Sequence, residues 1–200
     1  FKVLIIDNGS TDGSKEIISD TLDMEMVSLE TNLGFCGAVN LGIQMTNTPY
    51  IILLNNDTEV ITANWMEEML MYAQREDVGA VGAKLYYADK TIQHAGVVIG
   101  LGAHRTAGHT HYRIPVQNLG YMGRLCYTQN VTAVTGACLL VKTSVWDEVG
   151  GLDEAFAVAF NDVDFCVRVR EAGYTNVFTP FAQLYHYESK SRGGDEKDPV

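Results

Sequence analysis

The sequence of 200 residues is poor in basic side chains. It has 14 Lys and Arg against 25 Asp and Glu, which gives a formal net charge of −11 at pH 7. We therefore expect no nucleic-acid partner, because a phosphate backbone needs a basic surface. A small phosphate-bearing substrate remains compatible with this charge, since a divalent cation can join acidic side chains to a diphosphate.

Cysteines and long apolar runs are also scarce. None of the four cysteines forms a Cys-x-x-Cys pair, so the pattern indicates small core residues in a reducing compartment rather than a zinc or redox site. No apolar run reaches the roughly eighteen residues of a membrane helix, and no signal peptide is visible. The chain starts at Phe1, already inside an apolar run, which predicts a fragment of a longer protein.

Hydrophobic residues make up 46% of the chain, enough to bury one core, so we expect a single domain over 1–200 with a flexible tail from about 193 to 200. Runs at 2–6, 24–29, 50–54 and 78–87 predict strands, and helical spacing fills 14–22, 35–45 and 64–73. This alternation predicts an α/β fold with a doubly wound, mostly parallel sheet flanked by helices.

The second half of the chain is less regular. Extended segments are predicted at 95–101, 131–142 and 177–186, and helices at 144–149 and 163–172. Residues 104–127 have no clear period and are expected to form a long loop. Its histidines, His104, His109 and His111, fit a solvated loop near substrate better than a transition-metal site, and Arg105 and Arg113 are candidates to meet an anionic acceptor.

Two polar turns follow predicted strands, where ligands of α/β sheets bind. Asp7 can accept hydrogen bonds from a nucleoside. Asp7 and Asp12 can also cap the helix that follows, and spacing alone favours this second interpretation. The run Asn55-Asn56-Asp57 offers carboxylate and amide oxygens to a divalent cation, or forms an Asx turn.

Two further polar segments stand near the end of the chain. Asp162, at a predicted helix start, fits a general base or a helix cap. His186 can complete a metal shell or serve a structural role, and Arg192 follows it with Ser and Lys neighbours that suit a diphosphate. Alone, each of these segments is more simply explained as structural.

Six segments in this order resemble family 2 glycosyltransferases, especially bacterial ones that build O-antigens and rhamnose-containing glycans. They are IIDNGSTDGS (5–14), NLGFCGAVNLG (32–42), ILLNNDTEV (52–60), VTGACLLVKTSVWDEVGGLDEAF (134–156), NDVDFCVRVREAGY (161–174) and YHYESKSRG (185–193). Each match is weak, but together they span nearly the whole chain.

The resemblance implies a GT-A fold, Rossmann-like, and a role for each matching residue. The implied catalytic base is Asp162, and the implied metal ligands are Asn55, Asp57 and His186. The implied contacts to the donor, in the order nucleoside, sugar pocket and diphosphate, are Asp7, Asn32, Gly34, Ala38, Asn56, Gly136, Ala137 and Arg192.

The sequence departs from the family pattern at three places. The opening strand of the family has no counterpart before Phe1. Asn55 stands where the family has the first Asp of its metal motif, and Asn161 stands where a Glu usually precedes the base. The first replacement removes one negative charge from the expected metal site.

By this resemblance the chain is expected to be an inverting, metal-dependent enzyme. It would use Mn²⁺ or Mg²⁺, a nucleotide-diphosphate sugar donor and a glycan or lipid-linked acceptor, in the cytoplasm or at the inner face of the membrane. Two alternatives stay open: a sugar-1-phosphate nucleotidyltransferase, and a catalytically degenerate nucleotide- or carbohydrate-binding module.

Overall fold

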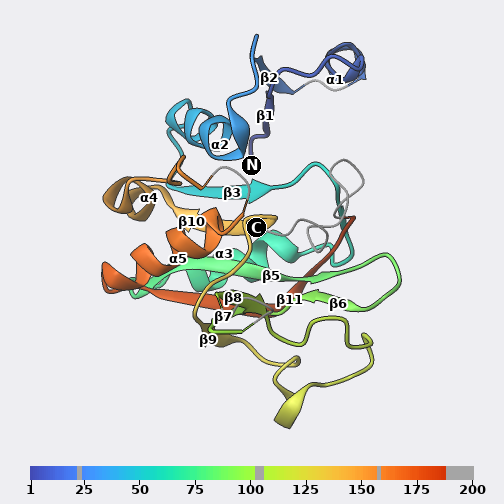
Figure 1. The fold of residues 1–200 in the computed structure, drawn as a ribbon, viewed down its shortest axis with the longest axis vertical. Helices are drawn as coiled ribbons and strands as arrows, with labels where there is room; N and C mark the ends of the chain where they lie inside the picture. The colour runs from blue at the N-terminus through green and yellow to red at the C-terminus, as the bar shows by residue number, and fades with distance from the viewer. Residues whose placement is uncertain (22–23, 102–105, 157–158, 188–200) are drawn as a thin grey trace.

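A seven-stranded sheet forms the centre of the computed structural model, which describes residues 1–21, 24–101, 106–156 and 159–187 (Figure 1). Along the sheet the strands are β3 (Tyr50–Leu54), β10 (Cys138–Lys142), β5 (Val78–Tyr86), β11 (Thr175–His186) and β4 (Thr58–Val60). Two short strands extend it, β6 (Ile92–His94) on β5 and β9 (Gln129–Val131) on β11.

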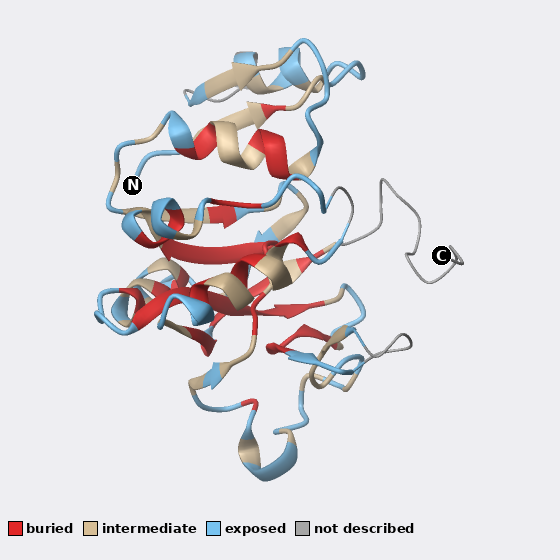
Figure 2. Cartoon of the chain, turned by 60° about the vertical axis from the view of Figure 1, so that its left-hand side comes forward, coloured by how far each residue is buried: buried red, intermediate tan, exposed pale blue. Residues whose placement is uncertain are grey.

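Helices cover both faces of this sheet, and the alternation along β10 shows why. Cys138 and Leu140 point into one apolar cluster, and Leu139 and Val141 into another, because successive strand residues face opposite sides. The first cluster includes the buried side chains of α3 (Trp65–Ala73), and the second those of α4 (Thr143–Val149) and α5 (Asn161–Glu171). The core therefore has two layers, with buried strands between them (Figure 2).

The expectation of a mostly parallel sheet is wrong. β10 runs antiparallel to both of its neighbours, β3 and β5, and the pairing of β5 with β11 is the one parallel ladder among the described strands of this sheet. β3 and β5 still point the same way, as a strand–helix–strand unit requires. A long connection precedes β10 in the sequence. The apolar pattern of 138–142 therefore predicts that a strand is present, but the direction of this strand in the sheet depends on the course of the connection.

The first forty-odd residues form a separate unit on one edge of the molecule (Figure 1). β1 (Leu4–Asp7) and β2 (Glu25–Ser28) pair in parallel, accompanied by α1 (Ser14–Thr21) and α2 (Gly34–Gln44). Asn40 ties α2 to the rest: its Nδ2 donates to the Leu152 carbonyl at 2.9 Å and its Oδ1 accepts from the Leu152 N–H at 3.0 Å. Gly42 lets β1 approach, since a Cβ there would lie 2.9 Å from Ile6.

The segment expected to be a long loop contains some regular structure. β7 (Val97–Ile99) and β8 (Ala107–His109) make an antiparallel hairpin, and the short helix η1 (Tyr121–Gly123) follows. His109 in this segment is less solvated than predicted, because its Nδ1 lies 2.9 Å from Nδ1 of the fully buried His94. Burial, with the nearby His109 and His186, holds the pKa of His94 well below its usual value.

Three of the four cysteines are core residues as predicted, namely Cys36, Cys138 and Cys166, whereas Cys126 is exposed. Burial raises the pKa of Cys138 and of Cys166 to about 12. Across the described ranges, no helix is both long and apolar enough to cross a membrane. The expected tail at 193–200 lies outside the described residues.

Gly82 provides a test of the packing that positions the segment 134–137. A Cβ at Gly82 would lie 2.5 Å from Val134 Cβ, so Gly82→Ala should lower the free energy of unfolding by about 1–3 kcal/mol through overpacking. Gly136→Ala is the matched control, because its Cβ would meet Asp162 Cβ at an ordinary 3.5 Å. Urea unfolding measures both, and equal stability of the two variants would contradict this account.

Candidate functional site

Asn55, Asp57 and His186 come together at one end of the central sheet. Asn55 directly follows β3, Asp57 lies in the turn into β4, and His186 is the last residue of β11. Antiparallel pairing of β11 with β4 sets His186 opposite Thr58, the residue after Asp57. The Tyr187 N–H also donates to the Asp57 carbonyl at 2.9 Å, so backbone bonds fix the three side chains as neighbours.

The His186 imidazole is buried and hydrogen-bonded through both ring nitrogens. Nδ1 lies 2.8 Å from Gln93 Oε1, and because an amide oxygen only accepts, Nδ1 carries the proton and donates it. Nε2 then has a lone pair and accepts from Asn55 Nδ2 at 3.2 Å. This is the neutral tautomer with Nε2 available as a ligand atom.

Asp57 Oδ1 lies next to His186 Nε2 and has no hydrogen-bond donor of its own. It is buried, accepts no hydrogen bond, and lies 3.1 Å from His186 Nε2. The contact would be an ion pair only with a protonated imidazole, but the proton on Nδ1 faces Gln93 and Nε2 receives the Asn55 N–H. Asp57 Oδ1 is therefore the unsatisfied acceptor of this pair, and a cation beside it would satisfy it.

These atoms suit a divalent cation of the manganese type. A carboxylate oxygen and an imidazole nitrogen are both accepted ligands of such ions. Asn55 presents its NH₂ group to His186, so its oxygen would face a cation only after a half-turn of the amide. Among the described residues, no group of three or more His, Cys, Asp and Glu side chains is placed to hold a metal, which agrees with an Asn at the first position of the motif.

Asp162 lies in the first turn of α5, with both carboxylate oxygens hydrogen-bonded to backbone N–H groups. Oδ2 accepts from Gly136 at 2.9 Å and Oδ1 from Val163 at 2.8 Å. Phe160, just before the helix, has a left-handed backbone with φ of 66°, a conformation that costs free energy in a residue with a side chain. Asp162 is thus held rigidly against the segment at Gly136.

Gly136 and Ala137 connect the carboxylate of Asp162 to the Asp57–His186 pair. The Gly136 N–H binds Asp162, and the carbonyl of the buried Ala137 accepts from the Asn55 N–H at 3.0 Å. Phe35 at the start of α2 lies beside the same segment, since its ring is 3.8 Å from where a Gly136 Cβ would stand. The expected base, metal and sugar-pocket residues are therefore contiguous.

The residues expected to contact the nucleoside lie on β1 and α2. Asn32 Oδ1 accepts from Asn8 Nδ2 at 3.0 Å and from the Gly34 N–H at 2.8 Å, which binds the two loops together. Ala38 is buried in α2. Asp7 is also buried, and its Oδ1 accepts from the Ser10 N–H at 3.2 Å, so it caps its own turn.

The remaining candidates are placed less favourably for a ligand. Asn56 is exposed in the turn between β3 and β4, and Arg192 lies outside the described residues. Arg113 stacks over Tyr87, 4.0 Å from the ring centroid, and pairs with Asp89 at 3.3 Å, so its guanidinium is occupied by two residues of the turn between β5 and β6. Asp12 caps α1, and hydrogen bonds from Ser14 lower its pKa.

The chain is similar in sequence to several known proteins. The profile described as "Glycosyl transferase family 2" matches residues 1–150. The chain is 44% identical to an uncharacterized protein, y4gI, of Sinorhizobium fredii and 34% to the O-antigen biosynthesis protein RfbC of Myxococcus xanthus, over 98% of this chain in each case. It is 30% identical over 96% of its length to the N-acetylglucosaminyl-diphospho-decaprenol L-rhamnosyltransferase of Mycobacterium tuberculosis. It spans 22%, 16% and 68% of these three relatives.

Two solved structures share the fold. GalNAc-T7 with UDP, GalNAc and Mn²⁺ matches with a TM-score of 0.76 at 13% identity, over 96% of this chain and 38% of that one. The mannosyltransferase PcManGT from Pyrobaculum calidifontis, in complex with GDP-Man and Mn²⁺, matches with a TM-score of 0.67 at 14% identity, over 96% and 49%. These likenesses confirm the predicted GT-A fold.

Gln93 was missed by sequence reasoning, and its role can be tested. Gln93→Leu removes the acceptor for Nδ1–H, so the imidazole should shift toward the Nε2–H tautomer, which can donate to Asp57. Long-range ¹H–¹⁵N NMR at about pH 8, above the usual titration range of histidine, reads the tautomer. We also expect Mn²⁺ affinity to fall at least about tenfold, as for other residues that orient a ligand.

Two further variants make this test specific. Gln93→Glu keeps an acceptor and should keep the Nδ1–H tautomer, and Gln117→Leu alters an exposed glutamine in the loop and should change nothing. An unchanged His186 tautomer in Gln93→Leu would show that Gln93 does not orient the ring.

Proposed function

Because the chain belongs to glycosyl transferase family 2, we propose that it transfers a sugar from a nucleotide-diphosphate donor to a hydroxyl of a glycan or lipid-linked acceptor, with inversion at the anomeric carbon. One observation carries this proposal. Asp57 Oδ1, a buried oxygen without a hydrogen-bond partner, lies 3.1 Å from His186 Nε2. The backbone segment at Gly136 and Ala137 connects this pair to the carboxylate of Asp162.

The donor is proposed to bind across the two units of the fold. Its nucleoside would lie against the loops joined by Asn8 and Asn32, near Asp7, Gly34 and Ala38. Its diphosphate would lie at Asp57 and His186, with Asn56 and Arg192 as further contacts, and its sugar at Gly136 and Ala137. The bonds from α2 to Leu152 support this arrangement, because they fix the nucleoside loops to the segment preceding α5.

Mn²⁺ or Mg²⁺ would be held by Asp57 and His186, with the Asn55 oxygen after rotation of its amide. When bound, the ion would supply Lewis-acid neutralisation of the negative charge that develops on the departing diphosphate. Oxygens of the donor diphosphate would fill the rest of the shell, as is usual where proteins offer few carboxylates.

Asp162 is proposed to be the general base. It would take the proton from the acceptor hydroxyl while that oxygen forms a bond to the anomeric carbon, and the bond from that carbon to the diphosphate oxygen breaks on the opposite face. A single displacement of this kind needs no covalent intermediate. The backbone N–H groups of Gly136 and Val163 support this role, because they fix both oxygens of the carboxylate.

The relatives support a place in cell-envelope polysaccharide synthesis. One is named for O-antigen biosynthesis, and another for transfer of rhamnose to a decaprenol-linked sugar. We therefore propose a saccharide or lipid-linked acceptor, reached from the cytoplasm or the inner membrane face. The solved neighbours hold UDP in one case and GDP in the other, so the donor base has to be measured.

The metal and donor site can be tested by thermal shift with UDP, dTDP and GDP, each with and without Mn²⁺. A nucleotide at about a hundred times its dissociation constant should stabilise the protein by about 2.7 kcal/mol. We expect a Mn²⁺-dependent shift with one nucleotide, lost in Asp57→Ala and kept in the exposed control Asp147→Asn. A shift that persists in Asp57→Ala would contradict the metal site.

The base assignment predicts a second result. Asp162→Asn should lower turnover of the identified nucleotide sugar by about 10²–10⁴-fold and leave the donor-induced thermal shift in place. Release of nucleoside diphosphate measures turnover, with Asp147→Asn again as control. Normal turnover in Asp162→Asn would exclude this base, and release of pyrophosphate would identify a nucleotidyltransferase instead. Donor binding without turnover in the unaltered protein would indicate a degenerate binding module.

A further inference from the structure

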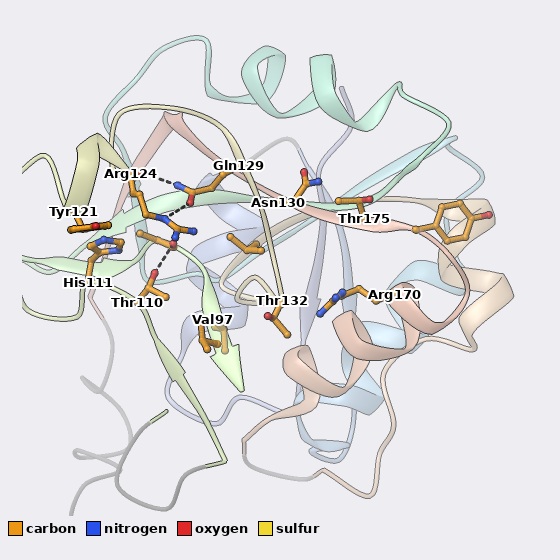
Figure 3. Close-up of a pocket in the computed structure, with 14 residues that line it drawn as sticks. Val97, Thr110, His111, Tyr121, Arg124, Gln129, Asn130, Thr132, Arg170 and Thr175 are labelled. Carbon is orange, nitrogen blue, oxygen red and sulfur yellow. Dashed lines mark hydrogen bonds between the residues drawn. The ribbon is translucent and has the colours of Figure 1, made fainter. Parts of the chain in front are cut away.

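A second cleft, of about 660 Å³, lies away from the proposed reaction centre (Figure 3). It opens between β9, the C-terminal end of α5 and the chain around β7 and η1. None of Asn55, Asp57, Asp162 and His186 lines it. A ligand in this cleft would therefore occupy a site distinct from the one described above.

The charge of this cleft is opposite to that of the chain. Among the described residues that line it, the charged side chains are those of Arg124 and Arg170, with no Asp or Glu, although acidic residues outnumber basic ones by 25 to 14 in the sequence. Figure 3 shows the two guanidinium groups directed into the cleft from opposite sides. Glu171 lines a smaller neighbouring hollow instead.

Neither arginine is neutralised within the described part of the chain. No carboxylate there forms an ion pair with Arg124 or Arg170. Gln129 Oε1 accepts from Arg124 Nε at 2.9 Å, which orients the guanidinium without removing its charge. Such groups favour carboxylates and phosphates, which they can bind through two parallel hydrogen bonds.

His111 gives an independent sign of a ligand site. Its Nδ1 is buried without a hydrogen-bond partner although the residue lines the cleft. Burial, and then the charges of Arg124 and Lys84, lower the pKa of His111, so the ring is a neutral hydrogen-bonding group. Its backbone has φ of 58°, and Met122 nearby in sequence has φ of 52°, a kind of strain that gathers at ligand sites.

The uncharged lining suits a sugar. The hydroxyl side chain of Thr132 and the amide of Asn130 line the cleft, and so does the exposed ring of Tyr121 (Figure 3). We propose that this cleft binds an anionic saccharide, with Arg124 and Arg170 as the groups that attract its carboxylate or phosphate. The choice of a saccharide rests on the proposed function, whereas the choice of an anion rests on the charges alone.

The position of the cleft allows one glycan to reach both sites. Arg170 follows Asp162 by eight positions on α5, which corresponds to about 12 Å along the helix axis. An acceptor glycan with an acidic residue could therefore present a hydroxyl at Asp162 while its charged sugar lies at Arg170.

Binding measured by NMR titration tests the proposal with four probes: glucuronate, glucose 6-phosphate, glucose and inorganic phosphate. We expect the two anionic sugars to perturb signals of the cleft and to bind more tightly than glucose or phosphate. Arg170→Gln and Arg124→Gln should each weaken this binding at least about tenfold, as loss of a charged hydrogen bond does. Arg75→Gln, which removes an exposed arginine bonded to Asp77 at 2.8 Å, should not.

Each other outcome has a defined meaning. Equal binding of glucose and glucuronate, or unchanged binding in Arg170→Gln, would overturn the anion site. Inorganic phosphate binding as tightly as glucose 6-phosphate would overturn the saccharide assignment. The Mn²⁺-dependent thermal shift with nucleotide should persist in Arg170→Gln. Absence of that shift in the unaltered protein would contradict the proposed function, whereas binding of the four probes would still test the cleft.

Discussion

The pairing of β11 with β5 and with β4 is the constraint on which the proposed site depends. β11 lies parallel to β5 along most of its length and antiparallel to β4 at its end. The second pairing brings His186 beside Asp57, which lies in a turn more than a hundred residues earlier in the chain. β5 in turn holds β10, whose first residues follow Gly136 and Ala137, so the same sheet fixes the segment that binds Asp162.

Sequence reasoning predicted those parts of the fold that repeat a local pattern. Apolar runs located β3, β5, β10 and most of β11. Asp57 was found in the polar turn after β3, and His186 at the end of β11. The direction of β10 escaped prediction, because direction is decided by a connection of some fifty residues without a period. Gln93 escaped as well: it lies on a three-residue strand, and only the fold places it against a ring more than ninety positions away.

The roles of two arginines also could not be predicted from the sequence. Arg113 stood out in sequence because of its histidine neighbours, but Tyr87 and Asp89 occupy it locally. Arg170, in contrast, looks like an ordinary surface residue in the last turn of a helix. What distinguishes it is the cleft it lines, which is formed by residues from four distant segments. The sequence shows which groups a side chain carries. Only the tertiary structure shows whether those groups already have hydrogen-bonding or charged partners.

Asn55 lowers the negative charge of the proposed metal site. A carboxylate in its place would add a second negative charge beside Asp57 Oδ1, which already lacks a hydrogen-bond donor. The amide instead donates to His186 Nε2 and so gives that ring nitrogen a hydrogen-bond partner. The same replacement leaves fewer negative charges to attract a cation, so the donor diphosphate has to supply more of the binding free energy. In this arrangement the ion and the nucleotide would bind together, each weakly without the other.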